Sequence, residues 1–256
     1  MRLVVLGRQG SGKGTQCARL SAELSIAHVS TGDLLRAAVE RRTALGRRVE
    51  RFLQLGELVP EDLALAVLSD RLAQDDVSDR GFVLDGFPRT VSQARQLATL
   101  LGPAYLDAVF ELSVPEDVVV QRMLRRRVCT CCGNVGSVTG GRSVAAACNR
   151  CGEALTVRPD DFEPIIRRRL ELYEAETAPL MHWFAAAGLL TRIDGLGPPD
   201  VVAGRLEAAL RSPGPGVARG ADLDTNTERN APAFPGHEGL VASALSPVIP
   251  PVWVTR

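Results

Sequence analysis

The stretch Leu3-Val4-Val5-Leu6-Gly7-Arg8-Gln9-Gly10-Ser11-Gly12-Lys13-Gly14-Thr15 decides the fold of this chain. Its apolar start is typical of a buried parallel strand, and the residues from Lys13 to Leu24 predict a helix. A strand, a glycine-rich turn and a helix N-terminus form a cradle in which backbone N–H groups and the helix dipole converge on an anion. The stretch therefore predicts a phosphate-binding loop that consists of Gly10, Ser11, Gly12, Lys13, Gly14 and Thr15.

Lys13 is the only lysine of the chain, whereas 29 positions are arginine. A compact ammonium group reaches into the β- and γ-phosphate region of a nucleotide, where a planar guanidinium fits poorly. The alternative is a glycine-rich turn that binds nothing. The preceding strand, the glycine spacing and the lysine together favour the phosphate loop.

The composition indicates one globular enzyme with moving parts. The formal net charge is zero, so no field favours non-specific nucleic-acid binding, and no apolar run approaches membrane-spanning length. The N-terminus enters a strand directly, without the pattern of a signal peptide. Four of the six cysteines form two CxxC pairs, which suggests a metal site in a reducing compartment. We expect a cytoplasmic monomer.

Strands alternate with helices along the chain, which predicts an α/β fold with a parallel sheet covered on both faces. Two segments look inserted, 30–59 and 128–160, and leave a core of residues 1–29, 60–127 and 161–211. Residues 212–256 are rich in proline, glycine and alanine and predict a disordered tail. The expected strands are Arg2–Leu6, His28–Ser30, Phe82–Asp85, Ala108–Leu112 and Leu190–Asp194.

The segment Ser30-Thr31-Gly32-Asp33-Leu34-Leu35-Arg36 follows the second expected strand. We expect Thr31 and Arg36 to lie at a phosphate-bearing acceptor, since Arg36 is about one turn into the following helix. The alternative for Thr31 is a helix cap, because a threonine at a helix start can accept from the first N–H groups.

The segment Asp85-Gly86-Phe87-Pro88-Arg89 ends the third expected strand, at the sheet edge where ligands bind. Asp85 is suited to hold Mg²⁺ through water, and Arg89 can clamp a phosphate through two hydrogen bonds. Gln93, four residues after Arg89, offers a donor and an acceptor to an adenine edge. The alternative for Asp85 is a turn residue at a strand end.

These motifs resemble the nucleoside monophosphate kinases, and the adenylate kinase family in particular, across nearly all of residues 1–211. The resemblance implies reversible phosphoryl transfer from Mg-ATP to AMP, giving two ADP, in a three-layer P-loop fold with a mobile AMP-binding arm (30–59) and a lid (128–160). It implies donor contacts by the phosphate loop and by Arg122, Arg126, Val135, Gly136 and Gly197. The implied acceptor contacts are Thr31, Arg36, Glu57, Leu58, Val59, Gly86, Phe87, Pro88, Arg89, Gln93, Arg158 and Arg169.

Phosphoryl transfer needs many positive charges around in-line oxygens and little acid–base chemistry, which fits a chain with three histidines. Arg125-Arg126-Arg127 is expected to close a helix that begins near Pro115, with Arg122 on the same face as Arg126. Arg125 and Arg168 are expected on solvated faces. The resemblance implies that the groups closest to the chemistry are Lys13, Asp85, Arg89, Arg126, Arg158 and Arg169.

Two CxxC pairs, Cys129/Cys132 and Cys148/Cys151, are separated by fifteen residues. Four thiolates at this spacing predict a tetrahedral, structural Zn²⁺ site, and bacterial long-lid relatives carry such a lid. Zinc ribbons also occur in nucleic-acid binders, which is the alternative. Cys131 is surplus to this set, and Cys17 is interpreted as a small core residue.

The chain departs from the family pattern at Gln9, where proline is usual, and at Arg125, where glycine is frequent. Gly136-Ser137 replaces a Tyr-His pair, and Val138–Ala147 replaces a proline-rich stretch. Two other functions stay open: a kinase of the same fold with another donor or acceptor, and a nucleotide-binding protein with weak catalysis.

Overall fold

The computed structural model describes residues 1–102, 105–137, 147–158 and 160–211. The predicted tail, 212–256, and most of the stretch Val138–Ala147 lie outside the described residues. Five strands form one parallel sheet in the order β2-β3-β1-β4-β8. The predicted fold class is therefore confirmed, and the strands differ from the expected ones by at most one residue at an end. The strands are β1 (Arg2–Leu6), β2 (Ala27–Ser30), β3 (Phe82–Asp85), β4 (Ala108–Ser113) and β8 (Leu190–Asp194).

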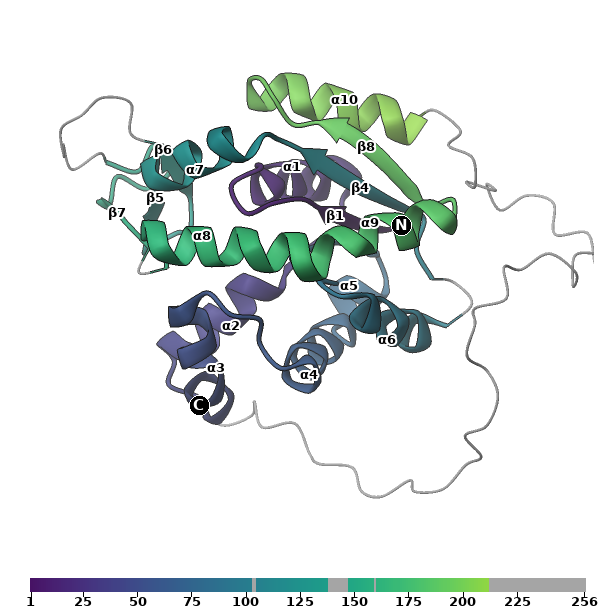
Figure 1. Cartoon of the computed structure of the whole chain (residues 1–256), viewed down its shortest axis with the longest axis horizontal. Coiled ribbons are helices and arrows are strands. Elements are labelled where there is room, and N and C mark those ends of the chain that lie inside the picture. Colours follow the sequence, from purple (N-terminus) through teal and green to yellow (C-terminus); the bar gives the residue numbers. More distant parts are fainter. Residues whose placement is uncertain (103–104, 138–146, 159, 212–256) are drawn as a thin grey trace, which may run out of the picture. The chain divides into compact units, whose positions relative to one another are not determined.

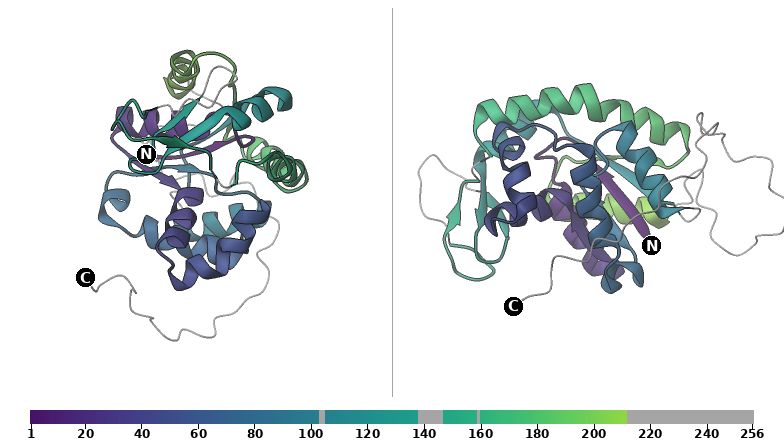
Figure 2. Two further views of the ribbon diagram at one scale, coloured as in Figure 1. Left: turned by 90° about the vertical axis from the view of Figure 1, so that its left-hand side faces the viewer. Right: turned by 90° about the horizontal axis from the view of Figure 1, so that it is seen from below.

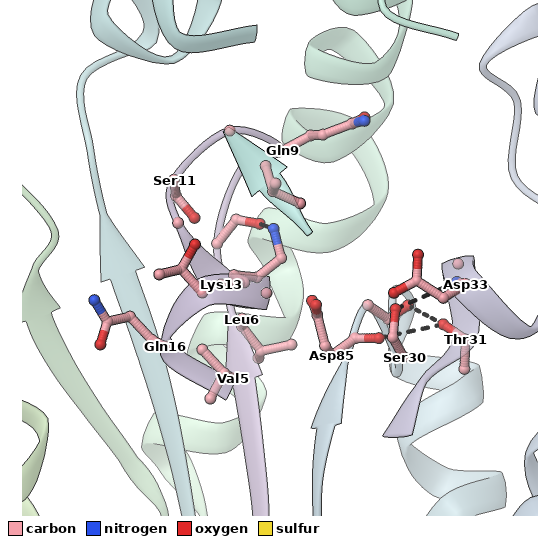
Figure 3. A pocket seen from close by; sticks show the side chains of 18 of the residues that line it. Val5, Leu6, Gln9, Ser11, Lys13, Gln16, Ser30, Thr31, Asp33 and Asp85 are labelled. Atoms are coloured by element: carbon pink, nitrogen blue, oxygen red, sulfur yellow. Dashed lines mark hydrogen bonds between the residues drawn. The ribbon is translucent and has the colours of Figure 1, made fainter. Parts of the chain in front are cut away.

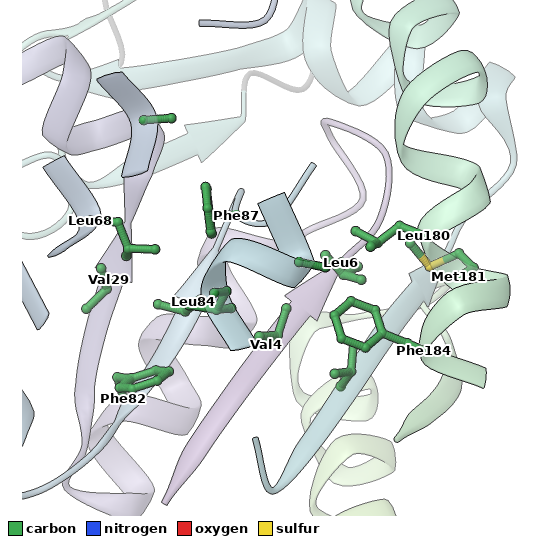
Figure 4. Packing of buried hydrophobic residues seen from close by; sticks show 14 of the residues in the cluster. Val4, Leu6, Val29, Leu68, Phe82, Leu84, Phe87, Leu180, Met181 and Phe184 are labelled. Carbon is green, nitrogen blue, oxygen red and sulfur yellow. The ribbon is translucent and has the colours of Figure 1, made fainter. Parts of the chain in front are cut away.

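Helices cover both faces of this sheet, because successive side chains of a strand point to opposite faces. Val4 and Leu6 of β1 pack with Phe184 in the cluster beneath α4, α6 and α9, as Figure 4 shows. Leu3 and Val5 pack on the other face against α1 and α10. The helices around the sheet are α1 (Lys13–Leu24), α4 (Glu61–Leu72), α5 (Asp75–Ser78), α6 (Val91–Leu101), α7 (Glu116–Arg125), α8 (Glu163–Leu172), α9 (Ala178–Ala186) and α10 (Pro199–Arg211), with a π-helical turn at Tyr173–Thr177 between α8 and α9.

Two smaller parts lie on the side of the sheet where the strands end (Figure 1). Helices α2 (Thr31–Glu40) and α3 (Ala44–Leu55) pack with α4 around Leu35, Val49 and Leu63. Strands β5 (Arg126–Cys129), β6 (Val135–Ser137) and β7 (Leu155–Thr156) form an antiparallel sheet in the order β6-β5-β7. Both parts are visible from two further directions in Figure 2. Within the described residues, no helix is both long and apolar enough to cross a membrane.

The end of α7 differs from the expectation. The helix ends at Arg125, and Arg126 adopts an extended conformation (φ −65°, ψ 138°) that opens β5. Arg126 pairs with Ser137 and Arg127 with Gly136 in the antiparallel sheet. Because Arg126 and Arg127 pair with β6, they do not continue the helix. Arg122 and Arg126 consequently do not share one helix face.

Candidate active site

The phosphate loop connects β1 to α1 through backbone conformations that suit glycine. Gly7 has φ 139° and Gly10 has φ 88°. A Cβ atom on Gly7 would lie 2.7 Å from the Leu112 carbonyl oxygen, and one on Gly10 would lie 2.8 Å from Met123 Cγ. No side chain caps the N-terminus of α1 at Gly12. The first N–H groups of this helix are therefore available to an anion.

Lys13 folds back over this loop, as Figure 3 shows. Its ammonium group donates to the carbonyl oxygens of Gly7, at 2.8 Å, and Arg8, at 2.9 Å. Burial lowers the pKa of Lys13, and the nearby Asp85 carboxylate opposes that shift. A partly desolvated cation gains more from a phosphate than a solvated one, since no hydration shell is removed on contact.

Asp85 ends the strand that lies between β1 and β2, with Val5 and Ser30 as its neighbours in register. A Cβ atom on Gly14 would lie 3.3 Å from Asp85 Oδ2, so the carboxylate faces the first turn of α1. Its side chain is 14 % exposed and lines the same cavity as Lys13. A single carboxylate at the rim of a phosphate cradle fits Mg²⁺, which keeps most of its water ligands.

Thr31 lies at the start of α2, but it is not the cap of that helix. The Ser30 hydroxyl accepts from the Asp33 N–H at 3.3 Å and caps α2. The Thr31 hydroxyl instead donates to the Gly86 carbonyl oxygen at 3.0 Å. The capping alternative for Thr31 is therefore wrong, and this hydroxyl links α2 to the segment after β3.

The segment after β3 is held by its own side chains. Arg89 Nε donates to the Gly86 carbonyl oxygen at 2.9 Å, and the Arg89 N–H donates to Gln93 Oε1 at 2.8 Å. Gln93 is 3 % exposed and lies on the first turn of α6, whose N-cap is Thr90. Figure 3 shows Asp85 between Lys13 on one side and Ser30 and Thr31 on the other.

One cavity of about 930 Å³ joins all of these segments. Its wall includes every residue predicted from the sequence to contact nucleotide. Besides Lys13, eight arginines line it: Arg19, Arg150 and the six that the sequence predicted to contact nucleotide. These six are Arg36, Arg89, Arg122, Arg126, Arg158 and Arg169.

These arginines repel one another in a poorly hydrated space. Burial, with the neighbouring Arg169, lowers the pKa of Arg89 to about 10. Burial, with Arg36 and Arg126 nearby, lowers the pKa of Arg158 to about 10. Phosphate groups would relieve both the repulsion and the desolvation, so the cavity is suited to several phosphates at once.

Acceptor groups that the sequence reasoning missed hold several of the arginines in place. Arg126 forms a bidentate ion pair with the buried Asp161 carboxylate, in which Nε donates to Oδ2 at 2.7 Å and Nη2 donates to Oδ1. Arg169 Nη2 donates to Asp160 Oδ2 at 2.8 Å and to the Leu53 carbonyl oxygen at 3.3 Å. The adjacent pair Asp160-Asp161, just after Arg158, was the signal in the sequence that could have revealed these partners.

Gln9 is a second contact that the sequence reasoning missed. Its side-chain oxygen accepts from Arg169 Nη1 at 3.0 Å. A proline, which the resemblance described above implies at this position, would have no side-chain acceptor. Arg122 reaches the loop from the other side, where Nη1 lies 3.4 Å from both the Ser11 and the Gly195 carbonyl oxygens.

The four predicted metal ligands form one cluster. Sγ of Cys129 lies 3.4 Å from Sγ of Cys151, and Sγ of Cys132 lies 3.5 Å from Sγ of Cys148. All four sulfur atoms lie within 4.8 Å of one another. All six cysteines of the chain are within the described residues, and each is a free thiol there.

The two CxxC turns share one backbone pattern. The Cys129 N–H donates to the Asn134 carbonyl at 2.9 Å, and the Gly133 N–H donates back to the Cys129 carbonyl at 2.9 Å. The second turn repeats this pairing between Cys148, Glu153 and Gly152, at 2.7 and 2.8 Å. Two equivalent turns that direct four thiols to one point fit a closed tetrahedral Zn²⁺ site.

Comparison with known proteins gives one family. A family profile described as adenylate kinase matches residues 5–189. The chain is 46 % identical over 214 residues to an adenylate kinase from Acidothermus cellulolyticus, which covers 82 % of this chain and 98 % of that protein. An adenylate kinase from Moorella thermoacetica is 43 % identical over 198 residues, 76 % of this chain and 91 % of its own length. One from Syntrophotalea carbinolica is 45 % identical over 199 residues, 77 % and 92 % of the two chains.

Proposed function

This chain belongs to the adenylate kinase family and catalyses reversible phosphoryl transfer between ATP and AMP, and we propose how its residues divide that reaction. The observation that carries the proposal is the convergence of Lys13 and eight arginines on one cavity beside a phosphate loop. Phosphoryl transfer depends on positioning and on electrostatic stabilisation more than on proton transfer. This cavity supplies many cations and few acid–base groups.

The donor half of the site is built on the loop Gly10–Thr15, whose backbone N–H groups and Lys13 bind the ATP phosphates. Arg122 and Arg126 approach from the side of α7 and β5, and Gly197 follows the turn after β8. Val135 and Gly136 of β6 contact the donor from the lid. Asp85 would hold Mg²⁺ through the water ligands of the ion, which would neutralise phosphate charge when bound with ATP.

The acceptor half lies between α2, the segment after β3 and the end of α3. Arg36 and Arg89 bind the AMP phosphate, and Thr31, whose hydroxyl donates to the Gly86 carbonyl oxygen, lines the same cavity. Gln93 reads the adenine, with Glu57, Leu58, Val59 and Gly86–Pro88 as the surrounding wall. Arg158 and Arg169 lie near both halves and stabilise the group in transfer.

Contacts between the arm 30–59 and the lid 128–160 support closure over the two nucleotides. Asp33 lies 3.8 Å from Arg158, and Arg36 lies 3.8 Å from Asp160. Arg169 donates to Leu53 of the arm. Closure excludes water, which would otherwise accept the phosphoryl group.

Zinc in the lid is structural in this proposal, because four thiolates leave no open position for substrate. The thiol-rich lid fits a reducing compartment, which favours the cytoplasm. We also propose that the enzyme acts as a monomer. Sedimentation of the purified protein at several concentrations tests the last point.

A pair of variants tests the division into halves. Arg36→Ala is expected to raise KM for AMP about tenfold or more, with a smaller change for ATP, because a charge-assisted hydrogen bond is lost on the acceptor side only. Arg122→Ala is expected to do the reverse. Steady-state rates with each nucleotide varied in turn measure both. Equal rises in the two KM values in both variants would contradict the assignment.

A further inference from the structure

Cys17, His28 and Asp85 form a cluster that the phosphoryl-transfer chemistry does not use as a unit. One ligand atom from each, a thiol sulfur, an imidazole nitrogen and a carboxylate oxygen, lies within 4.8 Å of the other two. This is the second group of potential metal ligands among the described residues, apart from the four lid cysteines. It lies beneath the phosphate loop rather than in the lid.

The fold brings these three side chains to one face of the sheet. On β3, Val83 packs on the side of α1, and Asp85 points to the same side because strand side chains alternate. On β2, Val29 packs on the opposite face, so its neighbour His28 points towards α1. Cys17 is one helical turn after Lys13 and packs against Val83.

The distances suit a metal ion after a small contraction. His28 Nε2 lies 3.7 Å from Asp85 Oδ2. In tetrahedral zinc sites, bond lengths of about 2.0–2.3 Å give ligand-to-ligand separations of roughly 3.3–3.6 Å. The 3.7 Å pair is already near this range, and the other two pairs, which lie within 4.8 Å, need a movement of about 1 Å at most.

His28 has an unused ligand atom. Its Nε2 is buried and makes no hydrogen bond to any described residue. A buried imidazole nitrogen without a partner is uncommon, and it favours an interaction that the polypeptide alone does not supply. The His28 and Asp85 side chains are 24 % and 14 % exposed and line the central cavity, so an ion can enter from that side.

We propose that Cys17, His28 and Asp85 bind Zn²⁺ or a similar borderline-soft divalent cation, and that this second metal site inhibits the enzyme. The mixed sulfur, nitrogen and oxygen set selects such an ion over Mg²⁺, which requires oxygen ligands. Binding recruits Asp85 away from the water ligands of Mg²⁺. The inhibitory part thus rests on the proposed role of Asp85, whereas the binding part does not.

The site is weaker than the lid site for two reasons. It has three protein ligands, one of which, the Cys17 thiol, must lose its proton. Lys13 lies close by, and its charge also opposes a cation. The lid therefore fills first, and the second ion binds only at higher free zinc.

Metal content at buffered free Zn²⁺ tests the binding part without nucleotide. The wild-type chain is expected to take up one ion more than Cys17→Ala and than His28→Gln. Cys131→Ser is the matched control, because it removes an exposed thiol outside the cluster, and it is expected to bind as the wild type does. Co²⁺ added to the zinc-loaded chain is expected to give a thiolate-to-metal absorption band in the wild type and not in Cys17→Ala.

Equal metal content of the wild type and Cys17→Ala would overturn the site. For the inhibitory part, loss of one ligand is expected to raise the free Zn²⁺ for half-inhibition about 100-fold in Cys17→Ala at constant Mg-ATP. If Cys17→Ala and His28→Gln lose the extra ion, but this ion leaves the turnover of the wild type unchanged, the inhibitory part of the proposal is overturned and the binding part stands. Failure of the proposed function would appear separately, as unaltered KM values in Arg36→Ala and Arg122→Ala.

Discussion

Among single residues of the proposed donor site, Lys13 shows how far a sequence can identify a functional residue. Its place after a strand and three glycines predicts its position at the N-terminus of α1, which the structure confirms. The sequence does not reveal that its ammonium group contacts the loop carbonyls of Gly7 and Arg8, since these contacts depend on the path of the loop.

We expect Lys13→Ala to lower kcat about 100-fold or more, because no other lysine exists to approach the transferred group. Arg8→Ala is the matched control. Arg8 is a cation of the same loop, but it contacts Glu174 at 2.8 Å and is absent from the cavity wall. ADP formation by both variants is the measurement, and near-normal activity of Lys13→Ala would refute the phosphate-loop assignment.

An amine reagent should label Lys13 besides the N-terminus, and bound ATP should protect Lys13 from this reagent.

Individual arginines show what sequence reasoning leaves out at this scale. Arg125 and Arg168 are exposed, as expected from arginine runs on helices. The partners of Arg126 and Arg169, by contrast, are acidic groups 35 and 9 positions away along the chain. Such pairs depend on how elements pack, so the adjacent acidic residues Asp160 and Asp161 signal that arginines have partners there but not which arginine each carboxylate binds.

At the scale of elements, the prediction from the sequence differs most clearly from the structure at the end of α7. Arginine is a good helix former, so Arg125-Arg126-Arg127 favours a continued helix. The structure instead pairs Arg126–Val128 with Val135–Ser137, and this pairing wins because it satisfies backbone groups at the base of the lid. Tertiary pairing overrides local propensity there, and the sequence offered only a weak signal in Gly133.

We expect the lid to depend on a bound metal ion, because the β5–β7 sheet is short and its strands bury few apolar side chains. Zinc removal, or Cys148→Ser, is expected to lower the midpoint of thermal unfolding, by about 2–4 °C for each kcal/mol by which the free energy of unfolding falls. Cys131→Ser is the control and should keep both zinc and midpoint. Metal analysis and thermal unfolding are the measurements. A reduced, folded sample without zinc would show that the four thiols serve another purpose.

Asp160 joins the lid to α8 and to the arm, and its effect on stability should depend on pH. Burial opposes ionisation of this carboxyl, but Arg169 and Arg36 outweigh burial and hold its pKa below the usual value. A lowered carboxyl pKa contributes stability above the unfolded pKa of about 3.9, and this contribution is lost as the pH falls through the lower folded value.

Asp160→Asn is therefore expected to lower the free energy of unfolding by about 1–3 kcal/mol relative to the wild type at pH 7. This difference should shrink below about pH 4. Denaturant unfolding of the two proteins at matched pH gives the difference. The exposed Asp70→Asn is the control and should show no deficit. A deficit of the same size at all pH values would contradict the ionic role of Asp160.

For the whole molecule, the sequence predicted the layered α/β architecture because a parallel sheet buried on both faces requires apolar runs such as Leu3–Leu6. It also predicted which segments border the cavity, since loops after parallel strands meet at one sheet edge. It could not predict the contacts of Arg158 with Asp33 and of Arg169 with Leu53, which join lid, arm and core. The proposed closure of lid and arm over the nucleotides depends on such contacts between distant segments of the folded chain.

The acceptor specificity of the intact enzyme tests the central claim most directly. Initial rates of diphosphate formation from ATP should give a kcat/KM for AMP far above the values for CMP, UMP and GMP. Gln93→Glu should narrow this gap, because it keeps an acceptor for the Arg89 N–H but loses the amide donor for adenine. Equal kcat/KM values of the wild-type enzyme for AMP, CMP and UMP would contradict the account.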